Sequence, residues 1–341
     1  MTSASGITPP LVESSPSKPR MRGTVRWGIV GAGNIANTFA RDMTHVAHAE
    51  VAAVAARSLA SASEFAKRHQ ISVAYEGYET LYSDPNVDAV YIATPHVLHA
   101  CNAADALRAG KAVMCEKPIT VSAAELKTLL GVARDQGNYL MEAMWTWFLP
   151  AFQKAQKWIA DGEIGELIHV KADFGFPMTY DPASRAYNPE LAGGCLLDTG
   201  IYPIAIARLF TNRAPTTIDV VARYAPNGVD DDVVMTFDYG NCVASLATSF
   251  RRKLPNIAYL IGTAGFIAIP DFWRAEECYL HRQDVSVRSF RDSRSGSGFE
   301  FQIASASEDI LQGRRQSAIV PHSASLAFQQ DMDRVRSQFA S

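Results

Sequence analysis

Residues 25–36 read VRWGIVGAGNIA, an apolar run that passes directly into a glycine-rich turn. Residues 25–30 are predicted to form a buried strand, and a helical pattern follows the turn. The first glycine permits a tight turn, the second lets the backbone approach a pyrophosphate, and Ala36 lets the helix pack close to the strand. Free N–H groups at the start of this helix predict a dinucleotide site. The expected phosphate contacts are Gly31, Gly33, Asn34 and Ile35.

The end of the second predicted strand, 50–56, indicates which dinucleotide fits. A strand that binds NAD normally ends in Asp or Glu, whose carboxylate bonds the ribose 2′-hydroxyl. Here the strand runs into Arg57 and Ser58. A guanidinium forks onto a phosphate and a serine adds a hydroxyl donor, so the pair predicts NADP rather than NAD. The alternative interpretation is that Arg57 is an exposed charge and that both cofactors are accepted.

Strands and helices alternate over residues 24–146. Helices of about 10–15 residues separate short apolar strands, a pattern that indicates βαβ units and a parallel, doubly wound sheet. We therefore predict an α/β chain in which 24–146 is a Rossmann domain. The predicted strands are 25–30, 50–56, 88–93, 112–116 and 139–144, and the predicted helices are 34–43, 58–69, 99–109 and 122–136.

The pattern changes in residues 147–341, which are predicted to form an α+β domain for substrate binding and oligomerisation. Consecutive short strands with tight turns, such as 239–241, are typical of a large and mostly antiparallel sheet. Residues 1–23 are expected to be a flexible tail or an arm that packs on a neighbouring subunit. The predicted elements are helices 150–161, 194–210 and 323–339 and strands 167–174, 216–224, 232–239, 242–250, 256–261, 266–269 and 277–282.

The composition excludes several classes of protein. At 341 residues and 37.2 kDa the chain is long enough for two domains. A net charge of −3 gives no basic footprint for nucleic acid, and the sequence has no apolar run long enough to cross a membrane. Five scattered cysteines form neither a disulfide framework nor a metal motif, so we expect a cytoplasmic protein.

Three further segments resemble a known family. They are 84–99, 110–118 with its Glu-Lys-Pro, and 193–202 with its paired glycines. Over roughly residues 24–330 the chain is similar to the Gfo/Idh/MocA oxidoreductases (glucose–fructose oxidoreductase, inositol dehydrogenase, MocA). The resemblance implies a nicotinamide cofactor on the first domain and a catalytic helix with Asp198 and Tyr202. The cofactor contacts that it implies are Thr94, Pro95, His96, His99, Glu116, Lys117 and Trp145.

Residues 141–145 and the tyrosine at 202 resemble one branch, the dimeric dihydrodiol dehydrogenases and NADP-dependent D-xylose 1-dehydrogenases. That branch implies oxidation of an aldose or a cyclic trans-diol with NADP. Two departures bear on the substrate: Trp147 stands where the branch has Arg, and Gln316 stands where it has Glu. The pocket aromatics that the resemblance implies are Trp145, Phe174, Trp273 and Phe299.

Hydride transfer to a nicotinamide needs a base for the proton of the substrate hydroxyl. Asp198 and Tyr202 are four residues apart, so both project from one helix face. A nearby ammonium, that of Lys117, favours the phenolate form of a tyrosine. We predict that Tyr202 accepts the proton, that Lys117 tunes it and bonds the substrate hydroxyl, and that Asp198 orients the pair. We also predict that the Lys117–Pro118 bond is cis.

Other interpretations stay open at this point. His96 and His99 have a spacing that metal ligands also use, but no third ligand lies nearby, so no metal site is predicted. Within the same class, the chain fits an NADPH-dependent reductase of a keto sugar such as an anhydrofructose, or glucose–fructose-type hydride recycling on a tightly bound cofactor. A different class is a sensor that binds NADP without turnover.

Apolar residues are also expected on the outside of the second sheet. Because side chains alternate along a strand, the apolar residues of the predicted strands cannot all face inward; these residues include Val220, Val234, Phe237, Leu246 and Phe250. An uncovered apolar sheet face is typical of an association surface. We therefore predict a homodimer or a higher homo-oligomer that forms through this sheet.

Overall fold

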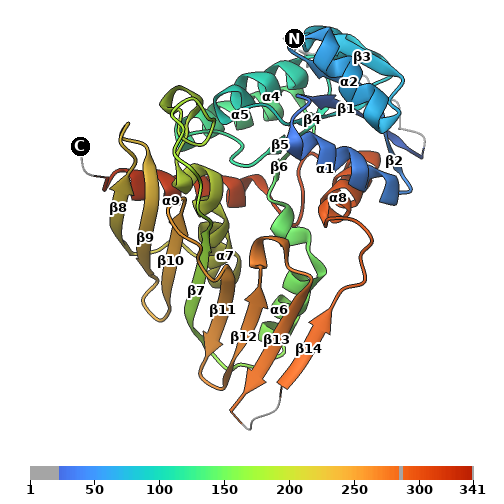
Figure 1. The fold of residues 1–341 in the computed structure, drawn as a ribbon. Helices are drawn as coiled ribbons and strands as arrows, with labels where there is room; N and C mark the ends of the chain where they lie inside the picture. Colours follow the sequence, from blue (N-terminus) through green and yellow to red (C-terminus); the bar gives the residue numbers. More distant parts are fainter. Residues whose placement is uncertain (1–22, 284–286, 340–341) are drawn as a thin grey trace, which may run out of the picture.

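The computed structural model describes residues 23–283 and 287–339, so the predicted tail lies outside the described residues except for Gly23. Figure 1 shows two sheets, each with its own set of helices. The first is parallel and has the strands β1 (Val25–Val30), β2 (Ala49–Ala56), β3 (Val73–Glu76), β4 (Ala89–Ile92), β5 (Ala112–Glu116) and β6 (Leu140–Ala143). Their order, β3-β2-β1-β4-β5-β6, is that of a Rossmann fold.

The helices of this half are α1 (Asn34–Asp42), α2 (Leu59–His69), α3 (Glu79–Ser83), α4 (His99–Arg108) and α5 (Ala123–Gln136). The predicted doubly wound sheet is confirmed, and its strands β4, β5 and β6 are buried at every position, as both-sided cover by helices requires. Strand β3 and helix α3 were not predicted from the sequence. Strand β3 has only four residues and none of them is fully buried, so it carries no apolar run.

The second sheet is mostly antiparallel and has eight strands. They are β7 (Leu167–Gly175), β8 (Thr217–Tyr224), β9 (Asp230–Asp238), β10 (Val243–Ser249), β11 (Ile257–Gly262), β12 (Gly265–Pro270), β13 (Glu277–Arg282) and β14 (Val287–Arg291). Their order is β14-β13-β12-β11-β7-β10-β9-β8, and only β7 and β10 pair in parallel. The predicted turn between β9 and β10 is confirmed, whereas β14 was not predicted.

Helices α6 (Pro150–Ala160), α7 (Ile201–Thr211) and α9 (His322–Arg336) contact this sheet. Helix α8 (Phe299–Leu311), which the sequence analysis missed, instead packs against α1, β1 and β2 of the first half. The chain therefore returns to the Rossmann domain near its C-terminus (Figure 1). None of the helices in the described ranges has the length and apolar character that a bilayer crossing requires.

One face of the second sheet is left open by the described helices (Figure 1). Along β9, Val233, Met235 and Phe237 are buried, while Val234 between them is 44% exposed. Val221 and Val243 on the neighbouring strands are also exposed. The alternation expected from the sequence is therefore present, and it leaves apolar side chains on the open face.

Candidate active site

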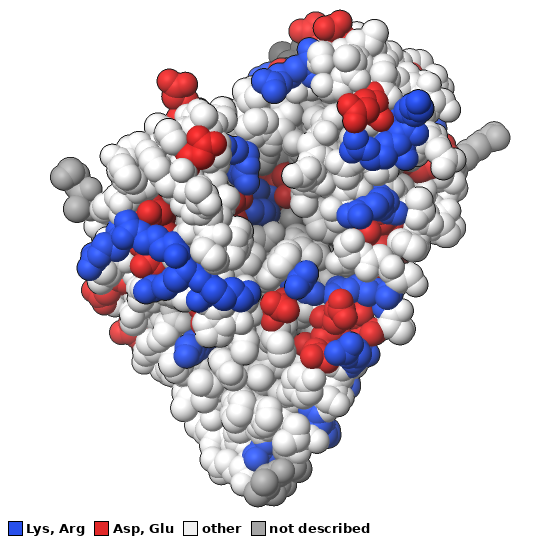
Figure 2. Space-filling model, in the orientation of Figure 1, with Lys and Arg blue, Asp and Glu red and all other residues white. Residues whose placement is uncertain are grey.

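Two cavities meet where the carboxyl ends of the parallel strands face the second sheet. The larger, of about 1100 Å³, lies beyond the ends of β1, β2, β4 and β5. The smaller, of about 390 Å³, is lined mainly by residues of the C-terminal half. Lys117, Asp198 and Tyr202 line both cavities, so they form the wall that the two share. Figure 2 shows the hollow at the junction of the two halves.

The glycine-rich turn has the geometry that a pyrophosphate needs. Gly31 has φ +98°, and a Cβ there would lie 2.8 Å from the carbonyl oxygen of Ala93, so only glycine fits. A Cβ on Gly33 would meet no atom within 4 Å, which leaves the backbone open to the cavity. Helix α1 begins here without a side-chain cap and without an acidic residue in its first turn. Its free N–H groups at Asn34 and Ile35 therefore fit a dinucleotide phosphate.

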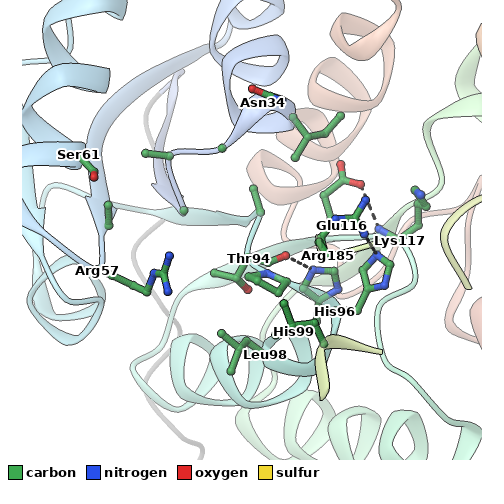
Figure 3. A pocket seen from close by; sticks show the side chains of 18 of the residues that line it. Asn34, Arg57, Ser61, Thr94, His96, Leu98, His99, Glu116, Lys117 and Arg185 are labelled. Carbon is green, nitrogen blue, oxygen red and sulfur yellow. Dashed lines mark hydrogen bonds between the residues drawn. The ribbon is translucent and has the colours of Figure 1, made fainter. Parts of the chain in front are cut away.

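Arg57 and Ser61 lie at one end of the large cavity, and Glu116, Lys117 and Arg185 lie at the other (Figure 3). Arg57 is exposed and forms no ion pair with a carboxylate in the described part of the chain. The Ser58 hydroxyl caps α2 by accepting from Ser61 N at 3.3 Å, so it serves the helix as well as the cavity.

Twelve of the thirteen predicted cofactor residues line the large cavity. They are Gly31, Gly33, Asn34, Ile35, Arg57, Ser58, Thr94, Pro95, His96, His99, Glu116 and Lys117. Ser61 and Tyr78 also line it and were not predicted. Ser61 follows Arg57 by one helical turn, a spacing that would have indicated it. Tyr78 lies in a short loop without a recognisable motif.

Lys117 and Asp198 are held together at the shared wall. The Lys117 Nζ donates to the backbone oxygen of Asp198 at 2.5 Å, lies 3.4 Å from its Oδ1, and is 4.9 Å from the centre of the Tyr202 ring. The Lys117–Pro118 bond is cis, as predicted. Asp198 lies in the π-helical turn 196–200 that precedes α7, and Asp230, not Asp198, accepts from the first N–H of that turn. Asp198 is thus free to face Lys117.

Burial and charge act against each other in this cluster. Burial would lower the pKa of Lys117, but Tyr202 and Asp198 raise it above its usual value. Burial would raise the pKa of Asp198, but Lys117 and Arg185 hold it well below its usual range. Burial raises the pKa of Tyr202, and Lys117 and a hydrogen bond from Trp145 offset only part of that effect. The expected help of the ammonium is therefore present, but desolvation outweighs it, and Tyr202 is a neutral phenol at neutral pH.

Arg185 completes the cluster and was missed by the sequence analysis. Its Nη2 lies 3.1 and 3.2 Å from the two carboxylate oxygens of Asp198, and its Nη1 lies 3.2 Å from His96 Nε2. Arg185 comes from the irregular segment after β7, where neither periodicity nor a motif marks it. It links a residue of the Rossmann half to one of the second half across the cavity.

The two histidines differ in their surroundings. His99 is 1% exposed, with Nδ1 2.7 Å from Pro118 O and Nε2 2.8 Å from Thr94 O, so both ring nitrogens are occupied. His96 faces the large cavity and contacts Arg185. Burial lowers the pKa of His96 to about 3, so its ring is neutral. These contacts are those of a structural residue and a cavity residue rather than of two metal ligands.

Aromatic side chains form one wall of the smaller cavity. Phe174 stacks on Trp273 at 5.1 Å between ring centres and meets Tyr202 edge to face at 5.4 Å. The other two predicted aromatics, Trp145 and Phe299, line neither cavity. Trp145 lies behind Tyr202, where its Nε1 donates to the phenolic oxygen at 3.0 Å, and Phe299 packs against Trp145. The lining residues that were not predicted are Phe176, Thr199, Lys253, Asn256, Asp271 and Arg274.

The two departures from the branch pattern lie away from both cavities. Trp147 is buried and packs edge to face on Phe328 at 5.0 Å. The Gln316 Oε1 accepts from His322 N at 2.9 Å, at the start of α9. Both residues therefore serve contacts within the C-terminal half, and neither lines either of the two cavities.

Comparisons with known proteins cover both halves of the chain. Residues 25–144 match the model of the oxidoreductase family with an NAD-binding Rossmann fold, and residues 152–268 match the GFO/IDH/MocA C-terminal domain. The trans-1,2-dihydrobenzene-1,2-diol dehydrogenase of Mus musculus is 38% identical over 307 residues, which are 87% of this chain and 91% of that protein. The Homo sapiens protein of the same name is 35% identical over 322 residues, 92% of this chain and 96% of its own.

Solved structures share the architecture. A 3-ketoreductase from Actinomadura kijaniata, in complex with NADP and TDP-benzene, has a TM-score of 0.81 at 27% identity and covers 92% of this chain and 97% of its own. An aldose-aldose oxidoreductase from Caulobacter crescentus has a TM-score of 0.84 at 24% identity, over the same shares of the two chains, and shows the same fold.

Proposed function

Because this chain belongs to the Gfo/Idh/MocA family of oxidoreductases, we propose that it is an NADP-dependent dehydrogenase of an aldose or a cyclic trans-diol. The observation that carries the proposal is the shared wall of Lys117, Asp198 and Tyr202 between a cavity of dinucleotide size and a smaller aromatic one. The names of the mouse and human relatives support the diol, and apolar faces opposite polar edges suit a sugar ring equally well.

A bound nicotinamide supplies the hydride acceptor, and the residues of this chain handle the proton. Tyr202 first loses its own proton to solvent, and its phenolate oxygen then takes the proton of the substrate hydroxyl. Lys117 stabilises the phenolate and donates to the substrate oxygen, since its Nζ lies beside the Tyr202 ring. Asp198 holds Lys117 in place, and Trp145 donates to the phenolic oxygen from behind. Because burial raises the pKa of Tyr202, oxidation is expected to become faster as the pH rises.

NADP is favoured over NAD in this proposal. The cavity end beside β2 offers the Arg57 guanidinium together with the hydroxyls of Ser58 and Ser61, and no carboxylate lines the cavity there. A cation and hydroxyl donors suit a 2′-phosphate, whereas a ribose 2′-hydroxyl needs an acceptor. The structural relative from Actinomadura kijaniata holds NADP, which supports the same choice.

A homodimer through the open sheet face is the second part of the proposal. Val221, Val234 and Val243 are 56%, 44% and 38% exposed on three neighbouring strands. Such a face is stabilised when a second copy covers it by two-fold symmetry. Light scattering at micromolar concentration should give twice the chain mass of 37.2 kDa or a higher multiple. A monomer mass would contradict this part.

The test of the activity is NADPH formation, followed by absorbance, with a panel of aldoses and trans-diols. Turnover of at least one compound with NADP, and slower turnover with NAD, is expected. Reduction of keto sugars by NADPH without oxidation of any alcohol would show that the enzyme works as a reductase. Binding of NADP without turnover of any compound in either direction would contradict the proposal and indicate a sensor.

A further inference from the structure

The smaller cavity is lined by more cationic side chains than the oxidation of a neutral alcohol requires. Lys117, Lys253 and Arg274 face it, against the carboxylates Asp198 and Asp271. Asp198 is occupied by Lys117 and Arg185 at the shared wall. Asp271 lies 3.7 Å from Arg274, and both side chains are more than half exposed, so this pair is weak. The mouth of the cavity therefore carries uncompensated positive charge.

Lys253 is the source of that charge. It ends the run Arg251-Arg252-Lys253 after β10. Arg251 lies 2.6 Å from an oxygen of Asp231, and Arg252 lies 3.0 Å from Asp232. Lys253, by contrast, is exposed, forms no ion pair or hydrogen bond within the described residues, and lines the cavity. Figure 2 shows Lys and Arg side chains along the upper edge of the second sheet, leading to the central hollow.

The backbone on both sides of Lys253 is fastened. Arg251 is fixed by its carboxylate partner, and Leu254 N donates to Gly175 O at the end of β7 at 3.1 Å. Asn256 Oδ1 accepts from Gly175 N at 3.0 Å. Because the backbone is already anchored, ligand binding at the mouth has to order only the Lys253 side chain.

Arg274 lies against an aromatic wall of the cavity. Its guanidinium carbon lies 4.9 Å from the centre of the Trp273 ring, one of the aromatic walls of the cavity. A planar guanidinium beside a ring presents a fork of donors, which matches the two oxygens of a carboxylate or of a phosphate.

We propose that the substrate carries an anionic group, a carboxylate or a phosphate ester, which Lys253 and Arg274 bind at the mouth of the cavity. The reacting hydroxyl then lies at the inner end, beside Lys117 and Tyr202, because these two residues are the ones shared with the cofactor cavity. An acidic sugar or a sugar phosphate fits better than its neutral parent. This inference rests on the proposed function, since it extends the same substrate site.

The experiment compares D-glucose with D-glucuronate and D-glucose 6-phosphate as substrates with NADP, which separates carboxylate from phosphate. The same three compounds are titrated against the tryptophan fluorescence of the NADP-loaded protein, because Trp273 lines the cavity. At least one anionic compound should have a KM roughly three- to tenfold below that of glucose, as expected for a charged hydrogen bond at an exposed site. Added salt should reduce this difference.

The variants Lys253→Gln and Arg274→Gln should each raise the KM of the anionic compound by roughly three- to tenfold relative to the KM of glucose. Arg252→Gln is the matched control, because Arg252 is the neighbouring cation but lines neither cavity. An equal loss in the control, or equal KM values for all three compounds in the parent protein, would overturn the inference while the proposed function stands.

Absence of any NADP-dependent turnover would instead contradict the proposed function. The fluorescence titration then decides on the anion site by itself. Tighter binding of an anionic compound that is lost in Lys253→Gln supports the site, and equal binding of all three compounds overturns it.

Discussion

The two cavities that meet at Lys117, Asp198 and Tyr202 are built by different means. The larger cavity, proposed to hold the cofactor, lies at the carboxyl ends of parallel strands and the start of α1, where the glycine-rich turn faces it. The smaller cavity, proposed to hold the substrate, is made of side chains from separate strands and irregular segments, such as Phe174 and Trp273. The position of the larger cavity follows from the topology of the sheet. The chemistry of the smaller cavity is set by individual side chains, so we expect substrate preference to depend on the second half of the molecule.

Substitution of the shared wall should damage the function of both cavities and give the largest effect. In Lys117→Ala the donor to the substrate oxygen and the positive charge beside Tyr202 are both lost. Turnover with NADP should fall by roughly 10²–10⁴-fold, the usual contribution of a placed acid–base group. Steady-state kinetics measure this, and Lys127→Ala, an exposed lysine on α5, is the control. Turnover near that of the parent would show that the wall is not the reaction centre.

A substitution at the far end of the larger cavity should change cofactor binding without changing substrate binding. Arg57→Asp places a carboxylate where a 2′-phosphate is expected, and it supplies an acceptor for a 2′-hydroxyl. The KM for NADP should rise by roughly 10- to 100-fold, while turnover with NAD should improve and the KM of the alcohol should stay the same. Arg57→Ala is the control. It should raise the KM for NADP without improving turnover with NAD. Equal efficiency of both cofactors in the parent would contradict the assignment.

A smaller effect is expected from the residue behind Tyr202. Trp145→Phe keeps an aromatic ring but removes the Nε1–H that donates to the phenolic oxygen. That bond lowers the pKa of Tyr202, so its loss should move the rise of oxidation rate to higher pH and slow turnover at neutral pH by roughly three- to tenfold.

Trp147→Phe is the matched control for that change. The Trp147 Nε1 has no hydrogen-bond partner in the described part of the protein, and its ring packs on Phe328. The pH profile of this variant should therefore be that of the parent. The same shift in both variants would mean that the effect comes from packing and not from the hydrogen bond.

The last effect concerns stability and leaves both cavities in place. Burial raises the pKa of Glu142, at the end of β6, to about 7, against 4.5 for a free carboxyl. The folded protein thus binds more protons than the unfolded chain between these values, so this group contributes stability below pH 4.5 that is lost as the pH rises through about 7. In Glu142→Gln the carboxyl is replaced by an amide, which does not titrate.

Urea unfolding of the parent and of Glu142→Gln at a series of pH values isolates this contribution. From about pH 5 to about pH 8 the parent should lose up to about 3 kcal/mol of unfolding free energy relative to the variant. Buried groups that do not interact with Glu142, such as His96, titrate equally in both proteins, so the difference between the two reports Glu142 and the charges coupled to it. A difference that does not change with pH would contradict the titration of this group.

The contrast between the cavities also explains what could be predicted from the sequence. The strand 25–30 and the glycine turn were predicted correctly because backbone geometry leaves a pattern in residue type and spacing. Helix α8 was missed because polar residues on its buried side conceal the helical period. Ser307 accepts from Trp27 Nε1 at 3.0 Å, and Asp309 accepts from Tyr139 OH at 3.1 Å.

The residues of the site also differ in whether the sequence marks them by a motif. Lys117, Asp198 and Tyr202 were indicated by motifs and lie together as the proposed chemistry requires. Arg185 and Lys253 were not indicated, because each lies in an irregular segment whose position depends on tertiary contacts. Trp145 and Phe299 were assigned to the pocket, but a resemblance of sequence does not distinguish a residue that lines a cavity from one that lies directly behind it.

The most direct test of the central claim is hydride transfer in a single turnover, measured across a range of pH for the parent and for Tyr202→Phe, with NADP bound to each. The variant loses one hydroxyl and keeps the ring, so NADP affinity and folding should be unchanged. The parent rate should rise with pH through one apparent ionisation that belongs to the Tyr202–Lys117 pair, and the variant should be roughly 10²–10⁴-fold slower. If Tyr202→Phe transfers hydride at the parent rate with the parent pH dependence, then Tyr202 is not the proton acceptor and the account is wrong.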